Sequence, residues 1–104
     1  MSKRESSGEP DASSKEEIKK RSPKLFNVYM HNDNYTTMEF VVHALESVFH
    51  KSLTDANSIM LRIHVKGMGK CGTYPLEIAE TKVNKVHSMA RKEEFPLRCS
   101  IEEV

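Results

Sequence analysis

The sequence contains no tryptophan, only two cysteines and only four glycines among its 104 residues. Cys71 and Cys99 are too far apart for a CxxC motif and too few for a disulfide framework, so we expect both thiols to be reduced. No apolar stretch approaches the roughly 18 residues of a membrane-spanning helix, and the N-terminus lacks the hydrophobic core of a signal peptide. These absences favour a cytoplasmic protein without a disulfide scaffold.

The chain also lacks an excess of charge of either sign. Its 16 Lys and Arg residues oppose 15 Asp and Glu residues, which gives a formal net charge of +1. Domains that bind nucleic acids usually carry a clustered basic field that attracts phosphates. We therefore expect neither a nucleic acid nor a membrane as a partner.

No pattern typical of catalysis or metal binding stands out. His64 and Asp33 could form a base and its orienting group, but no serine or cysteine lies in a nucleophile motif. The segment Gly67-x-Gly69 is too short to cradle a phosphate, and the five histidines lack HxxxH and HExxH spacing. We expect a non-enzymatic protein with no catalytic residue, no metal site and no cofactor.

Composition divides the chain into two parts. Residues 1–24 contain no aromatic residue and one large aliphatic, Ile18, so they cannot offset the entropy of ordering. We expect this segment to be a disordered N-terminal extension, either a neutral leader or a functional tether. Residues 25–104 form the predicted folded domain.

Hydrophobic periodicity predicts an α+β fold. Phe26, Val28 and Met30 alternate with polar or exposed neighbours, which indicates a strand over 25–31. Apolar residues that recur three or four positions apart predict two helices. The first spans 37–50 and is capped by Thr36 or Thr37, and the second spans 55–66 and is capped by Thr54. A short strand over 70–74, a third helix that starts at Pro75 and a closing strand over 97–101 complete the order βααβαβ. We expect a small α/β sandwich, in which a three-stranded antiparallel sheet is covered on one face by three helices.

The triplet Asn32-Asp33-Asn34 joins the first strand to the first helix. Such residues commonly form turns by bonding nearby backbone groups, and that reading needs no ligand. Here, however, the triplet lies close to Met38, so a polar rim would meet an apolar wall. The oxygens of Asn32 and Asp33, with a ring nitrogen of neutral His64, could accept hydrogen bonds from an α-amino group.

Four ordered blocks connect the chain to a known family. They read "HNDNYTTMEFV" at 31–41, "IMLRIHVKGMGKCG" at 59–72, "EIAETKV" at 77–83 and "PLRC" at 96–99. The region from about Lys24 to Val104 resembles the ClpS family of ATP-dependent Clp protease adaptors, whose first block looks like "hNDDYTPMEFV". The resemblance implies an adaptor that delivers N-degron proteins to a ClpA- or ClpC-type AAA+ unfoldase for degradation by ClpP.

The resemblance also assigns roles by position. It implies that Asn32, Asp33 and His64 hold the α-amino group of a substrate. A hydrophobic pocket for Leu, Phe, Tyr or Trp at the substrate N-terminus would be formed by Thr36, Met38, Val41, Met60, Ile63 and Leu97. Met38 would exclude β-branched first residues.

Docking to the N-domain of the unfoldase is implied for Glu77 and Lys82, and delivery for the extension 1–24. By helical spacing, Glu77 and Lys82 are expected on neighbouring turns of one exposed helix face. The protein is expected to act as a monomer. Asn34 and Thr37 depart from the Asp and Pro of the family pattern, which leaves affinity and preference open. An alternative also stays open, namely a module that docks on an unfoldase without binding N-degrons.

Overall fold

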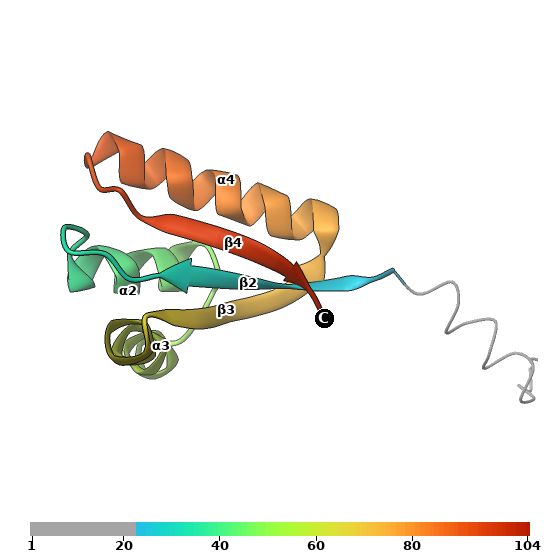
Figure 1. Cartoon of the computed structure of the whole chain (residues 1–104), viewed down its shortest axis with the longest axis horizontal. Coiled ribbons are helices and arrows are strands. Elements are labelled where there is room, and N and C mark those ends of the chain that lie inside the picture. Colours follow the sequence, from blue (N-terminus) through green and yellow to red (C-terminus); the bar gives the residue numbers. More distant parts are fainter. Residues whose placement is uncertain (1–22) are drawn as a thin grey trace, which may run out of the picture.

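The computed structural model describes residues 23–104 and confirms the predicted architecture. Its elements, shown in Figure 1, are β2 (Leu25–His31), α2 (Met38–Ser47), α3 (Leu53–Lys66), β3 (Met68–Pro75), α4 (Leu76–Lys92) and β4 (Arg98–Glu103). The three strands form one antiparallel sheet in the order β3-β2-β4. Of the predicted extension 1–24, residues 1–22 lie outside the described residues.

β2 is the central strand, and its two faces differ as the alternation predicts. Val28 and Met30 are fully buried against the helices. The other face carries polar pairs between strands: His31 Nε2 lies 2.6 Å from Ser100 Oγ, and Thr73 Oγ1 donates to Asn27 Oδ1 at 2.6 Å. The sheet therefore has one face for the core and one for solvent.

The start of α2 depends on a local contact, and its end depends partly on a contact from a distant part of the chain. Thr37 caps its start, because the Thr37 hydroxyl oxygen accepts a hydrogen bond from the Phe40 N–H at 3.1 Å. The helix ends at Ser47, three residues before the predicted end. Two features explain this early stop: His50 adopts a left-handed φ of 57°, and the side chain of Lys82 donates to the Val48 carbonyl.

α3 begins earlier than predicted, at Leu53. The predicted cap, Thr54, is wrong: the cap is Ser52, whose hydroxyl oxygen accepts a hydrogen bond from the Asp55 N–H at 3.1 Å. The predicted strand 70–74 extends at both ends into β3, while the closing strand begins one residue later than predicted. Pro75, the predicted start of the third helix, is instead its N-cap, and α4 begins one residue later, at Leu76.

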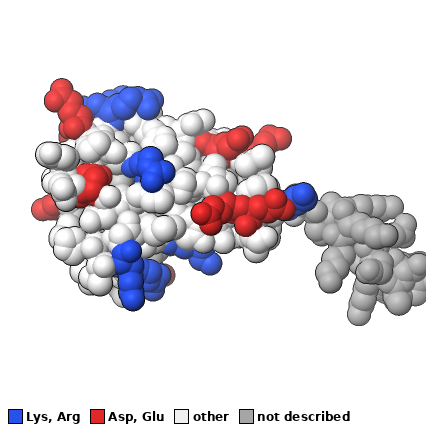
Figure 2. Space-filling view, viewed as in Figure 1, with Lys and Arg blue, Asp and Glu red and all other residues white. Residues whose placement is uncertain are grey.

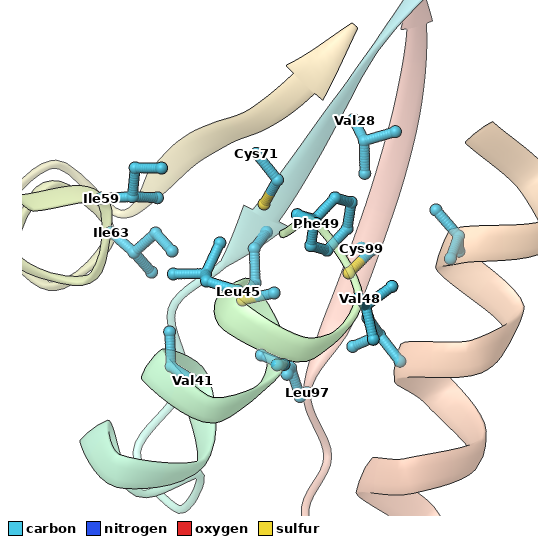
Figure 3. Close-up of a cluster of buried hydrophobic side chains, with 14 of the residues drawn as sticks. Val28, Val41, Leu45, Val48, Phe49, Ile59, Ile63, Cys71, Leu97 and Cys99 are labelled. Carbon is cyan, nitrogen blue, oxygen red and sulfur yellow. The ribbon is translucent and has the colours of Figure 1, made fainter. Parts of the chain in front are cut away.

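The hydrophobic core lies between the sheet and the three helices (Figure 3). Ile59 and Ile63 of α3 point toward the sheet, and Leu45 of α2 occupies the centre with no exposed surface. Both cysteines are buried free thiols, and burial raises the pKa of Cys99 to about 12. They serve as small apolar core residues.

The surface of the described residues carries charges of both signs. On the face drawn in Figure 2, acidic and basic side chains are interspersed, with no continuous basic stripe on that face of residues 23–104. None of the helices in the described part of the chain has the length and apolar character needed to cross a bilayer.

Candidate functional site

A cavity of about 260 Å³ opens beside the turn that follows β2. Its lining comes from two stretches, one running from that turn into α2 and the other near the end of α3: Asn32, Asp33, Asn34, Thr36, Met38, Val41, Met60, Ile63 and His64. Pockets for drug-sized ligands usually span roughly 300–1,000 Å³, so this cavity has the size for a single amino-acid side chain and adjoining groups. Eight of the nine residues predicted for the site meet here.

The two stretches are joined by one backbone hydrogen bond. The Asn32 N–H donates to the Gly67 carbonyl oxygen at 2.9 Å, which ties the end of β2 to the end of α3. Gly67 terminates α3 in a left-handed conformation, φ 92°, which glycine adopts without strain. Gly69 allows close packing, because a Cβ there would lie 2.9 Å from Ile63 Cγ1. These features bring Asn32 and His64 to the same cavity.

The carboxylate of Asp33 organises the turn. Its Oδ1 accepts hydrogen bonds from the Tyr35 N–H at 2.8 Å and the Thr36 N–H at 2.7 Å, and its Oδ2 accepts the Thr36 hydroxyl at 2.7 Å. Burial raises the pKa of Asp33, but these hydrogen bonds together outweigh it and hold the pKa below the ordinary value. Asp33 is therefore an ionised group within the wall, and the only Asp or Glu in the lining.

The remaining polar groups are free to meet a ligand. Within residues 23–104, the side-chain amides of Asn32 and Asn34 and the imidazole of His64 form no hydrogen bond, and all three residues are exposed. His64 lies in the last turn of α3, where the helix dipole presents its negative end. The rim of the cavity therefore combines unpartnered acceptors with a field that favours a cation.

The inner wall is apolar. Val41 and Ile63 are buried, at 7% and 2% exposure, and belong to the main core. Met60 is half-buried, whereas Met38 is 46% exposed near the start of α2. An apolar group in the cavity would thus rest on rigid core residues and touch flexible methionines.

Two outcomes differ from the predicted lining. Leu97 does not line the cavity: it is 6% exposed and part of the hydrophobic core, just before β4. It belongs to the same core cluster as Val41 and Ile63, which do line the cavity. Asn34, in contrast, lines the cavity, although only Asn32 and Asp33 of the triplet were predicted to contact a ligand. Its position directly after Asp33 was the available signal.

The predicted docking pair lies away from the cavity, on α4. Glu77 is exposed in the first turn, as expected. Lys82 was expected on the same open face, and the structure corrects this: it is half-buried, and its Nζ donates to the Val48 carbonyl at 2.7 Å. Nζ also lies 5.1 Å from the ring centroid of Tyr74 and 5.9 Å from that of Phe49. Lys82 thus secures the end of α2.

Comparison with known proteins gives a consistent result. Residues 21–100 match the family model described as "ATP-dependent Clp protease adaptor protein ClpS". The chain is 53% identical over 104 residues to the ATP-dependent Clp protease adapter protein ClpS of Oleidesulfovibrio alaskensis (strain ATCC BAA-1058 / DSM 17464 / G20), covering 100% of both chains. It is 52% identical over 100 residues to the protein of the same name from Lawsonia intracellularis (strain PHE/MN1-00), covering 96% of this chain and 90% of that one.

A solved structure is similar in fold as well as in sequence. Agrobacterium tumefaciens ClpS2 bound to L-phenylalaninamide superposes with a TM-score of 0.77 at 32% identity, covering 80% of this chain and 100% of that chain. The match therefore spans the full length of that chain. Together with the family model and the two relatives, it shows that this chain belongs to the ClpS family of ATP-dependent Clp protease adaptors.

Proposed function

We propose that this adaptor binds proteins through a free N-terminal α-amino group and a bulky first side chain, Leu, Phe, Tyr or Trp. The observation that carries the proposal is a single cavity with acceptors at its rim and core residues at its base. A ligand that suits both halves must carry a cation directly beside an apolar group. The first residue of a polypeptide has this structure.

The acceptors match the three hydrogens of an α-ammonium group. A carboxylate has about four lone-pair sites, and three hydrogen bonds from the turn occupy Asp33, which leaves about one for a ligand. The side-chain oxygen of Asn32 and a ring nitrogen of neutral His64 supply two more. An acetylated N-terminus has no charge and only one N–H donor, so its burial would leave acceptors of the rim unsatisfied.

The apolar half would supply selectivity among first residues. Full burial of a Leu or Phe side chain contributes about 1.5–3 kcal/mol. Val41 and Ile63 are fixed by the core, whereas Met38 and Met60 can adapt to several bulky shapes. We expect Met38 to lie against the β-carbon of the first residue and so to disfavour Ile and Val.

Delivery is the second half of the proposal. Glu77 and Lys82 would contact the N-domain of a ClpA- or ClpC-type AAA+ unfoldase, and residues 1–24 would serve as the tether that passes the substrate on toward ClpP. The chain makes and breaks no bond in this scheme. The bound state of Agrobacterium tumefaciens ClpS2 supports the binding step, because L-phenylalaninamide carries a free α-amino group next to a phenyl side chain.

Fluorescence anisotropy with three labelled peptides tests the binding step. The peptides differ only at the N-terminus: free Phe, acetylated Phe and free Ile. We expect the free Phe peptide to bind at least about tenfold more tightly than either control, which corresponds to ~1.4 kcal/mol. Equal affinity for free and acetylated Phe would refute the proposal and favour a module that docks on an unfoldase without recognising N-degrons.

A further inference from the structure

A second hollow adjoins the cavity and has no assigned role. It is a groove of about 300 Å³ between α2 and α3, lined by Met38, Glu39, Val42, His43, Glu46, Asn57 and Met60. Met38 and Met60 line both the groove and the cavity. A chain whose first side chain fills the cavity therefore needs to pass only two flexible side chains to reach the groove.

The groove has an apolar floor and an acidic rim. Glu39, His43 and Glu46 follow one another at intervals of four and three residues, so they lie on one exposed face of α2. Val42 of the same helix and the two methionines provide the floor. No Lys or Arg lines the groove, and neither glutamate forms a salt bridge within residues 23–104. Two carboxylates thus face the hollow without a cationic partner in this part of the chain.

This combination matches a long basic side chain. The aliphatic stem of Lys or Arg packs along apolar surface while its charged end remains in water near an opposite charge. Successive residues of an extended peptide advance by about 3.3 Å. With the first residue in the cavity, the residues directly after it are therefore the ones that can reach the groove. An acidic residue at the same place would meet two like charges.

We propose that this groove receives the side chain of the second or third residue of a bound polypeptide and prefers Lys or Arg there over Glu or Asp. The inference rests on the proposed N-terminal binding and extends it from one residue to a short basic motif. It predicts that substrates sharing the same bulky first residue are ranked by the charge of the residues that follow.

A peptide series with a free N-terminal Phe and a common tail tests the ranking. Its members begin Phe-Ala-Ala, Phe-Lys-Ala, Phe-Ala-Lys and Phe-Glu-Ala. We expect one of the Lys peptides to bind about threefold to tenfold more tightly than Phe-Ala-Ala, and the Glu peptide to bind less tightly, because exposed ion pairs are individually modest. The Lys advantage should shrink as salt is raised, since salt screens exposed charges.

The double variant Glu39→Gln with Glu46→Gln localises the effect. We expect the ratio between the Lys and Ala peptides to fall below about twofold in this variant, with thermal unfolding used to verify that it remains folded. Glu80→Gln is the matched control: it removes one exposed glutamate from α4, outside the groove, and should keep the ratio of the wild-type protein.

The possible failures are distinguishable. If wild-type protein binds no member of the series, the proposed function fails and this inference fails with it. If all four peptides bind equally, or if the Lys advantage survives in the double variant, only the groove assignment is overturned. A groove that instead holds a second copy of the chain would appear as a dimer in sedimentation that the double substitution dissociates, and that result would also overturn the assignment.

Discussion

Replacing the carboxylate of Asp33 by an amide is the sharpest test of the cavity. Asp33→Asn keeps the shape of the side chain but removes the only Asp or Glu charge in the lining. The amide oxygen can still accept from the N–H groups of Tyr35 and Thr36, which lie 2.8 and 2.7 Å from Oδ1 in the native turn. The amide nitrogen cannot accept the Thr36 hydroxyl that Oδ2 accepts in the native turn.

The expected losses of affinity and stability in Asp33→Asn follow from these hydrogen bonds. Hydrogen bonds to charged groups contribute about 1.5–3 kcal/mol, and the substitution removes the carboxylate charge that would face the ammonium group, so this contact should lose about 1.5 kcal/mol. That loss corresponds to a roughly tenfold weaker affinity for a free Phe peptide. The turn should also lose about 1 kcal/mol of stability through the unpaired Thr36 hydroxyl. Anisotropy and chemical denaturation measure the two effects separately.

Thr36→Val separates charge from loop stability. It removes the hydroxyl that donates to Asp33 Oδ2 but leaves the carboxylate and the backbone donors in place. We expect a similar loss of stability with an affinity reduced by no more than about threefold. The proposed role of the Asp33 charge would be refuted if Asp33→Asn bound the free peptide as tightly as the wild-type protein, or if the two variants lost affinity equally.

The pH dependence of this turn has a definite sign. The folded protein holds the pKa of Asp33 below its ordinary value, so the unfolded chain binds the proton more readily. The stability contributed by Asp33 is therefore fully present above about pH 4 and is lost as the pH falls through the lower, folded pKa. At pH 5 the carboxylate stays ionised, and its part in peptide binding should persist.

Three further predictions concern single contacts. Met38→Ala should raise the affinity for an Ile-initiated peptide relative to Phe, and an unchanged ratio in anisotropy would remove the proposed selectivity role. Lys82→Gln should lower the free energy of unfolding by about 1 kcal/mol, because it weakens the hydrogen bond to the end of α2; Lys85→Gln, exposed on the same helix, should leave it unchanged in urea denaturation. Burial, with nearby arginines, lowers the pKa of His87, whose Nε2 accepts the Cys99 N–H at 2.9 Å. Stability should therefore be complete above about pH 6.5 and decline below it, and His87→Gln should reduce that decline.

The Lys82 result bears on the docking proposal. If Lys82→Gln lost unfoldase binding, two causes could not be separated: the loss of a contact with the unfoldase, and the loss of the hydrogen bond that holds the end of α2. Glu77→Gln avoids this ambiguity, because Glu77 is exposed and forms no salt bridge within residues 23–104. Binding of the unfoldase N-domain that is weakened by Glu77→Gln at unchanged stability would support a contact on α4, and unchanged binding would contradict it.

The element order was predictable because each element carries its own period. The buried residues Val28 and Met30 are two positions apart in β2, whereas the buried residues of the helices recur at intervals of three and four. Boundaries were less predictable, since they depend on the whole fold. Ser52 and Thr54 are both good caps, and which one acts depends on where the chain turns after α2. The early end of α2 reflects a contact from Lys82, 34 residues away.

The site was predicted by resemblance to a family, and the structure supplies the contacts that spacing could not. Asn32 and His64 are distant in sequence, and nothing local predicts the hydrogen bond from the Asn32 N–H to Gly67. The second groove was missed for a related reason. Glu39, His43 and Glu46 form an ordinary solvated face by sequence, and become a groove wall only because α3 packs beside them.

Under the proposed function, the order of the turn at Asp33 and the capacity to bind a ligand would be coupled. The carboxylate of Asp33 is held by three donors from its own turn, so the proposed rim is ordered by the protein's own hydrogen bonds. The same bonds leave that carboxylate only about one free acceptor site, so under the proposed function an ammonium group would also need acceptors from Asn32 and His64. The small domain thus gains a preorganised site without opening its core, because Val41 and Ile63 serve as core residues and cavity wall at once.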